Sequence, residues 1–155
     1  MINIMEKDIT IIIAEDDQGH ATLIEKNLKR TGIMNPIIHF ENGEDVLNFL
    51  FKTGEGEHRK SGLSYLLLLD IRMPRIDGMD VLRIIKQDKE LVKMPVIIIT
   101  TTDEPKEIEL CHKLGCNNYV TKPIDYDKFV EVIKQLGLFL KIIQCPNLNG
   151  VYSND

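Results

Sequence analysis

The sequence has no apolar run that approaches the length of a membrane span. A transmembrane helix needs about 20 consecutive apolar residues, and the first eight residues lack the basic start and apolar stretch of a signal peptide. Basic residues are in deficit, because 19 Lys and Arg stand against 24 Asp and Glu and give a formal net charge of −5. We therefore expect neither a membrane protein nor a protein whose main task is to bind nucleic acid.

Cysteine is also scarce. Cys111, Cys116 and Cys145 make an odd number without the spacing of a disulfide framework. Reduced thiols are the simplest interpretation, and they favour a cytoplasmic protein.

Histidine forms no recognisable site in the sequence. The four histidines lie in four separate segments, and no pair has the spacing of metal ligands. We expect all four at the surface: His20, His39, His58 and His112.

Five short apolar runs alternate with helix-like segments over 155 residues. The runs 9–14, 66–69 and 96–100 are apolar throughout, which is typical of strands covered by helices on both faces. Weaker runs lie at 37–40 and 118–121. The predicted helices span residues 20–30, 44–52, 79–87, 105–114 and 126–143. The pattern predicts an α/β fold, (βα)5, with a doubly wound parallel sheet and right-handed crossovers.

The predicted domain covers residues 1–145, with its core at about 9–143. Residues 54–64 are polar and glycine-rich and are expected to form a surface loop. The polar tail 146–155 is expected to be loosely ordered, with no output domain after it. Asp125 is expected to cap the last helix, and Thr102 or Asp103 the helix before it.

Polar side chains stand at the ends of four predicted strands. Ligands of an open parallel sheet bind beyond the carboxyl ends of its strands. The side chains brought to that edge are Glu15, Asp16 and Asp17, then Asp70, then Thr100, Thr101 and Thr102, and finally Lys122, which precedes Pro123. Clustered carboxylates raise one another's pKa, and a hard cation such as Mg²⁺ relieves that conflict with oxygen ligands.

This set of residues suits phosphoryl transfer. Asp70 would be the nucleophile and form an aspartyl phosphate, while Lys122 and Thr100 could hold the phosphoryl oxygens. A single Asp after a strand is ordinary in a loop. The ordered combination of an acidic pair, Asp, Thr and Lys-Pro is far more specific.

At this point the residues match a family. The stretches IIIAEDD, LLLLDIRMPRIDG, PVIIITT and YVTKP resemble the receiver domains of two-component response regulators, the CheY-like superfamily. The resemblance covers residues of about 9 to 143 and implies a flavodoxin-like sheet with strand order 2-1-3-4-5.

The resemblance implies a metal site and a phosphoacceptor. Asp70 is the acceptor, Asp16 a direct Mg²⁺ ligand, and Glu15 acts mainly through metal-bound water. The backbone carbonyl of Arg72 completes the protein ligands. Asp16–Asp17 is an alternative acidic pair, but Asp17 lies farther from the strand and is expected to start the first helix.

The resemblance also implies a switch. Thr100, with Thr101 beside it, contacts the phosphoryl group together with Lys122, and the rotamer of Tyr119 follows Thr100. Three further residues shape the loops around the site: Pro74, Gly78 and Pro123. In the family the Lys122–Pro123 bond is cis. We hypothesise that the Arg72 side chain shields the acyl phosphate from water.

The long loop 54–64 and the extended last helix resemble single-domain regulators that partner phytochrome-type sensor kinases. Such proteins often form a homodimer through the fourth helix, fifth strand and fifth helix. The surplus apolar residues of segment 136–143 either form that seam or fold back onto their own domain. The expected partners are a sensor histidine kinase and a downstream protein target.

The favoured function is a stand-alone receiver that catalyses only its own phosphorylation and dephosphorylation and turns over no separate substrate. A degenerate receiver used only for binding would have lost an acid, Thr or Lys. A Mg²⁺-dependent phosphohydrolase would place its Asp nucleophile in a D-x-D pair after the first strand, where this chain has Glu15, Asp16 and Asp17.

Overall fold

A computed structural model describes residues 9–149. Five parallel strands form one sheet in the order β2-β1-β3-β4-β5, which confirms the predicted doubly wound topology. The strands are β1 (Ile9–Ala14), β2 (Ile37–Phe40), β3 (Ser64–Leu69), β4 (Val96–Thr100) and β5 (Asn118–Thr121). The helices are α1 (Gln18–Arg30), α2 (Gly43–Phe51), α3 (Gly78–Gln87), α4 (Pro105–Leu114) and α5 (Tyr126–Leu140), with a 3₁₀ turn, η1 (Leu91–Lys93), before β4.

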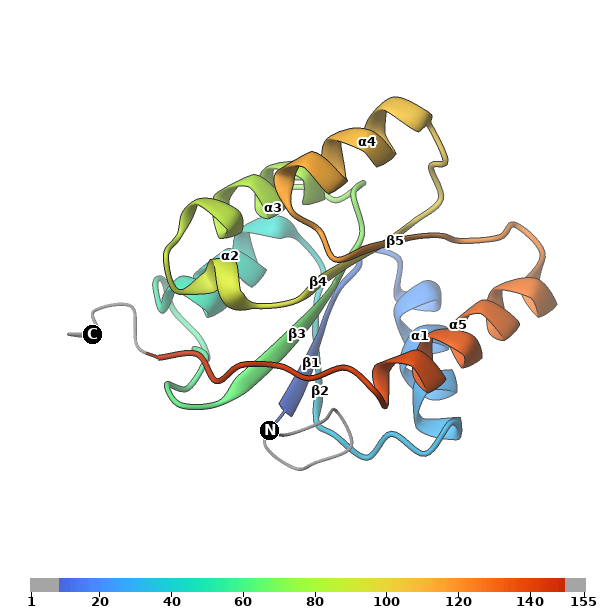
Figure 1. Cartoon of the computed structure of the whole chain (residues 1–155), viewed down its shortest axis with the longest axis horizontal. Helices are drawn as coiled ribbons and strands as arrows, with labels where there is room; N and C mark the ends of the chain where they lie inside the picture. The colour runs from blue at the N-terminus through green and yellow to red at the C-terminus, as the bar shows by residue number, and fades with distance from the viewer. Residues whose placement is uncertain (1–8, 150–155) are drawn as a thin grey trace.

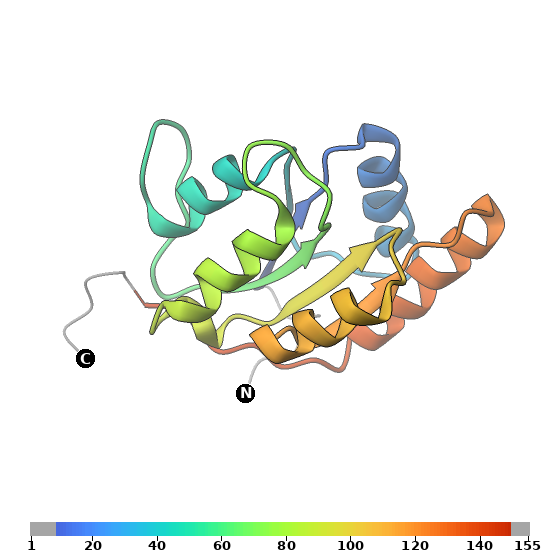
Figure 2. The same cartoon turned by 90° about the horizontal axis from the view of Figure 1, so that it is seen from above.

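Helices cover both faces of the sheet (Figures 1 and 2). Successive side chains of a strand point to opposite faces, so Ile11 and Ile13 of β1 pack with α1 and α5, while Ile12 packs with α2 and α3. Because both faces are buried, the strand has no position for an exposed polar residue. This explains why the central runs are apolar throughout rather than alternating.

Several predicted boundaries move by one to three residues, and those of β3 and α5 have a clear structural cause. β3 begins at Ser64 rather than residue 66, because Ser64 pairs with Ile9 of β1 and its hydroxyl donates to the Asn147 side chain at 2.6 Å. α5 ends at Leu140 rather than residue 143. The amides of Ile142 and Ile143 bond to carbonyls three residues back, and Ile143 packs against the α1–α5 side of the core.

The helix caps follow side-chain chemistry at most positions. Asp17 and Asp125 accept hydrogen bonds from backbone amides in the first turns of α1 and α5, as expected of N-caps. The prediction for α4 is wrong, because its N-cap is Glu104, which makes no side-chain cap bond. The Thr102 hydroxyl instead accepts from the Glu104 amide at 3.3 Å, and Pro105 fills the first turn, where no amide donor is needed.

The expectation of a loosely ordered tail is wrong for residues 146–149, while 150–155 lie outside the described residues. Leu148 is fully buried and forms an antiparallel bridge with Leu63. Its amide donates to the Leu63 carbonyl at 2.8 Å, and its carbonyl accepts the Gly62 amide at 2.7 Å. Figure 1 shows the chain after α5 running back toward the loop before β3. Burial of the apolar Leu148 side chain stabilises this segment, although its neighbours in the sequence are mostly polar.

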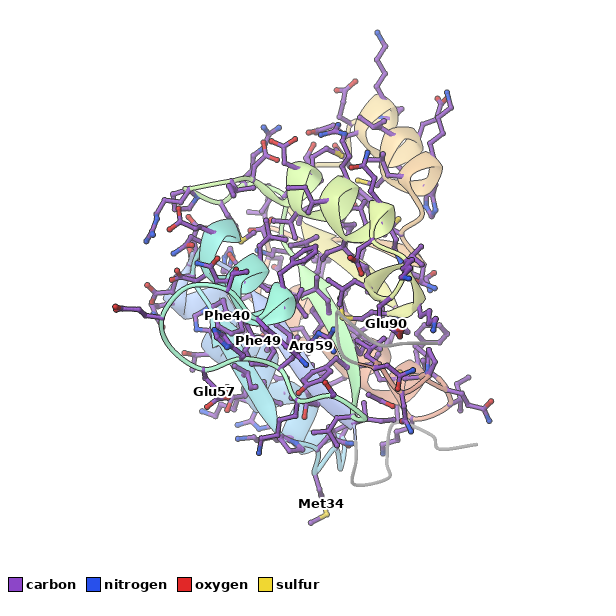
Figure 3. The ribbon with its side chains drawn as sticks, turned by 90° about the vertical axis from the view of Figure 1, so that its left-hand side faces the viewer. Met34, Phe40, Phe49, Glu57, Arg59 and Glu90 are labelled. Atoms are coloured by element: carbon purple, nitrogen blue, oxygen red, sulfur yellow. The ribbon has the colours of Figure 1, made fainter. Side chains whose placement is uncertain are left out.

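The loop 54–64 is mostly exposed but contains one buried cation. The Arg59 guanidinium donates to the carbonyl oxygens of Leu50 at 2.7 Å and Asn149 at 2.8 Å. Figure 3 shows Arg59 beside Phe49, whose carbonyl accepts the Arg59 amide. Arg59 therefore ties the loop, α2 and the tail together. No helix within residues 9–149 is long and apolar enough to cross a bilayer.

Candidate functional site

The carboxyl ends of four strands bring the predicted site residues to one edge of the sheet. Glu15 and Asp16 follow β1, Asp70 follows β3, Thr100 ends β4 and Lys122 follows β5. All are buried except Asp16, which is exposed. The strands end together because they are parallel and in register, for example Ala14 with Leu69.

Three carboxylates converge at this edge. Glu15, Asp16 and Asp70 each place one oxygen within 4.8 Å of the other two. Asp17 does not join them, because its carboxylate accepts the His20 amide at 3.0 Å as the N-cap of α1. Of the two possible acidic pairs, Glu15–Asp16 is therefore the one that the structure brings to Asp70.

Lys122 lies between the acids. Its ammonium donates to Glu15 Oε1 in a close ion pair and to Asp70 Oδ2 at 3.3 Å, and it lies 3.1 Å from Nδ1 of His20. A buried ammonium must have such partners, since burial of an unpaired charge costs several kcal/mol, on the order of 5. The site thus holds its lysine inside the cluster rather than at the surface.

Glu15 shows how strained the electrostatics of the cluster are. Burial is the main cause that raises its pKa from 4.5 to about 7, and the Asp70 carboxylate raises it further, while the bond to Lys122 opposes both. One lysine therefore does not fully compensate the buried acids. The carboxylate oxygens of the three acids are hard metal ligands. They suit a small divalent cation, which would supply the missing positive charge.

Thr100 carries a hydroxyl without a partner. Its Oγ1 is buried and makes no hydrogen bond within residues 9–149, while its carbonyl accepts the Lys122 amide at 2.6 Å. Buried hydroxyls are nearly always bonded, so this donor is available to a ligand oxygen. Thr101, next along the chain, is exposed.

Tyr119 connects β5 to the loop between β4 and α4. Its hydroxyl donates to the Thr102 carbonyl at 2.8 Å, and burial raises its pKa to about 12. The ring packs against the α2–α3 side of the core. The role of Tyr119 as a rotamer switch stays a prediction.

The Arg72 side chain reaches from the β3–α3 loop to α4, and its role as a shield of the acyl phosphate stays a prediction. Its guanidinium is 69% exposed and pairs with Glu107 of α4 at 3.3 Å, and Glu107 in turn accepts from the Thr102 hydroxyl at 2.8 Å. The side chain therefore links the β3–α3 loop to α4. The role of the Arg72 carbonyl as a metal ligand stays a prediction.

Pro74 in the β3–α3 loop and Gly78 at the start of α3 explain the tight path of this segment. A Cβ on Gly78 would lie 2.0 Å from the Asp70 carbonyl oxygen, so only glycine allows this approach. The Gly78 amide donates to the Ile71 carbonyl at 2.7 Å, and the Pro74 carbonyl accepts the amide of Gly43 in α2.

The expected cis bond before Pro123 is wrong. No peptide bond within residues 9–149 is cis, so Lys122–Pro123 is trans. The two isomers of a prolyl bond differ by only about 0.5–1 kcal/mol, so the Lys-Pro motif alone does not fix the isomer.

Two histidines that were expected at the surface contact the site. His20 is partly exposed but reaches Lys122, and His39 Nε2 lies 2.6 Å from the Glu15 carbonyl oxygen. One signal could have found His20, because it lies in the first turn of the helix that follows the acidic stretch. His39 is on the neighbouring strand β2, whose pairing with β1 places it beside Glu15.

Comparison with known proteins agrees with this geometry. The model of the response regulator receiver domain family matches residues 11–134. A receiver domain from Rhodospirillum rubrum shares 44% identity with a TM-score of 0.85, covering 91% of this chain and 99% of its own. The Mn²⁺-bound form of the response regulator Rcp1, a protein of Synechocystis, shares 27% identity with a TM-score of 0.81, covering 88% and 98%.

A third similar structure is that of the phosphorylated cyanobacterial phytochrome response regulator RcpA. It shares 26% identity with a TM-score of 0.79 and covers 89% of this chain and 98% of its own. The matched stretch includes all four strand ends that carry the site. On sequence, topology and site geometry together, this chain belongs to the response regulator receiver family, with phytochrome-associated regulators among its relatives.

Proposed function

We propose that this receiver is a phosphorylation-controlled switch that accepts a phosphoryl group on Asp70 from a histidine kinase. One observation carries the proposal: the Asp70 carboxylate lies at a buried ammonium, beside two further acids and near a buried hydroxyl that has no partner among the described residues. Buried polar groups in a purely structural cluster are nearly always hydrogen-bonded. This cluster leaves donors and negative charge for a ligand.

The chemistry is a displacement at phosphorus. An Asp70 oxygen forms the new O–P bond while the P–N bond to the kinase histidine breaks, and the electron pair leaves on that nitrogen. Mg²⁺, held by Glu15, Asp16, Asp70 and the Arg72 carbonyl, would neutralise charge on the phosphoryl oxygens. Lys122 and Thr100 would bind the remaining oxygens.

The output would be a change of protein contacts. When the Thr100 hydroxyl turns to the phosphoryl group, it would change the space beside Tyr119. The Tyr119 hydroxyl is hydrogen-bonded to the β4–α4 loop. That loop leads into α4, which contacts β5, while α5 packs on the other face of the sheet. We infer that the surface formed by α4, β5 and α5 binds a downstream protein or a second copy of the chain.

Exposed apolar side chains on the two helices that flank β5 support the output site. Leu138 and Phe139 of α5 and Leu110 of α4 are exposed. A hollow of about 360 Å³ lies between β5 and α5, lined by Asn118, Val120, Val132, Gln135, Leu136 and Phe139. Of the surplus apolar residues in the last helix, Leu136 and Leu140 are buried in their own domain, while the homodimer seam stays a prediction.

No observation favours a binding-only receiver, because the acids, Thr100 and Lys122 are all in place at the strand ends. A phosphohydrolase is not favoured either, since the acceptor follows β3 rather than β1. We propose that the protein turns over no separate substrate. Its chemistry ends with its own aspartyl phosphate and the hydrolysis of that phosphate.

The test is intact mass after incubation with acetyl phosphate and Mg²⁺. We expect a gain of one phosphoryl group on the wild type, none without a divalent cation, and none on Asp70→Asn. Asp77→Asn is the matched control, because Asp77 lies in the same loop but caps α3. An adduct that survives in Asp70→Asn, or no adduct on the wild type, would contradict the proposal.

A further inference from the structure

We propose that His20 is a positioning residue that holds the Lys122 ammonium at the phosphoryl-binding edge; this inference rests on the proposed function. Three groups surround the ammonium: Glu15 Oε1, Asp70 Oδ2 at 3.3 Å and His20 Nδ1 at 3.1 Å. An ammonium has three donors and no acceptor capacity. The three partners therefore use all of its donors, and Nδ1 of His20 must be the acceptor.

The hydrogen-bond inventory fixes the form of the imidazole. An accepting Nδ1 carries no proton, so the neutral ring carries its proton on Nε2. That nitrogen faces the Asp17 carboxylate, with Nε2 and Oδ2 3.9 Å apart. Asp17 is itself fixed as the N-cap of α1. In this tautomer the protonated Nε2 faces a carboxylate and the unprotonated Nδ1 faces an ammonium.

Packing fixes the direction of the ring. His20 meets Phe129 of α5 edge to face, with the ring centroids 5.4 Å apart and the planes at 88°. Phe129 is buried between α1 and α5. The lysine therefore receives one of its three partners from a side chain that α1 and α5 hold together, outside the four strand ends.

A neutral acceptor has a specific advantage at this place. Glu15 and Asp70 are also the groups that would meet a divalent cation, so the cation competes with Lys122 for them. His20 is not part of that carboxylate cluster. It can hold the ammonium while the acids turn to the cation, and it does so without neutralising the charge that a phosphoryl group needs.

A matched pair of variants separates this role from packing. His20→Leu keeps an apolar side chain against Phe129 but removes the acceptor. His20→Asn places Oδ1 near the position of Nδ1 and restores it. With acetyl phosphate and Mg²⁺, we expect His20→Leu to form the aspartyl phosphate about tenfold more slowly than wild type and His20→Asn to stay within about threefold, as one charge-assisted hydrogen bond predicts.

Wild-type rates in His20→Leu, or equal slowing in both variants, would overturn the inference while leaving the Asp70 proposal intact. An absence of any adduct on the wild type would overturn both. A second measurement needs no variant: long-range ¹H–¹⁵N correlation on the resting wild type should show Nδ1 of His20 unprotonated and Nε2 protonated. A proton on Nδ1 would overturn the inference directly.

Discussion

Two buried cations lie at opposite ends of the parallel strands, and the groups that bind them differ in chemical kind. Lys122, 3% exposed, binds two carboxylates and a histidine beyond the carboxyl end of β5. Arg59, 2% exposed, binds the backbone carbonyls of Leu50 and Asn149 near the start of β3. Carbonyls carry no charge to share with a ligand, so Arg59 is a structural link. The carboxylates at Lys122 retain negative charge, and so that edge can bind a cation and a phosphoryl group.

The largest expected effect removes the functional cation. Lys122→Met should slow phosphorylation by acetyl phosphate about a hundredfold, because one preorganised donor to developing charge is lost. The measurement is the rate of adduct formation by intact mass. Lys128→Met, on the exposed side of α5, is the control and should react at the wild-type rate. If Lys122→Met did so too, the two cations would not differ as described.

The next effect removes the structural cation. Arg59→Met should lower the free energy of unfolding by about 2–3 kcal/mol, because the buried carbonyl of Leu50 and the partly buried carbonyl of Asn149 lose a charged donor. Urea denaturation followed by circular dichroism measures it. Lys60→Met, at the exposed neighbouring position, should change stability by less than about 0.5 kcal/mol. Phosphorylation of Arg59→Met should be unchanged, and a slowed rate would show that Arg59 also serves the site.

The sequence predicts one of these edges far better than the other. Parallel topology alone places Asp70, Thr100 and Lys122 together, because each follows a recognisable strand. The role of Arg59 depends on Asn149, which is 90 residues away in the sequence, and no local pattern reports such a contact. The contact between His20 and Lys122 also joins residues 102 positions apart, and the one local signal for His20 is its place in the first turn after the acidic stretch.

The acids at the Lys122 edge should make stability depend on pH. The pKa of Glu15 is about 7 in the folded protein against 4.5 ordinarily, so between these values the folded state binds more protons than the unfolded state. Its contribution is fully present below pH 4.5 and is lost as pH rises through about 7.

In EDTA, urea titrations at several pH values should show stability falling over this range. Glu15→Gln should remove about 1–2 kcal/mol of that fall, whereas Glu109→Gln on the exposed side of α4 should not. If the free energy of unfolding had the same pH dependence in Glu15→Gln as in the wild type, protonation of Glu15 would not be its cause.

The smallest expected effect concerns the exposed side chain at the rim. Arg72→Asn should hydrolyse its aspartyl phosphate about threefold faster, because a side chain that can cover the acyl phosphate is lost. Loss of the exposed ion pair of Arg72 should lower the free energy of unfolding by less than about 1 kcal/mol. Intact mass after removal of acetyl phosphate gives the rate. Arg75→Asn, which breaks the pair with Glu44 in the same loop, should hydrolyse at the wild-type rate. Equal rates in both variants would disprove shielding by Arg72.

The most direct measurement is an NMR titration of the wild type with beryllofluoride and Mg²⁺, a stable mimic of the aspartyl phosphate. The account predicts that the amide signals of Thr100, Tyr119 and Lys122 shift together, that Arg59 at the opposite edge stays unchanged, and that Asp70→Asn shows none of these shifts. Signals that do not move in the wild type, or that move equally in Asp70→Asn, would contradict Asp70 as the input of the switch.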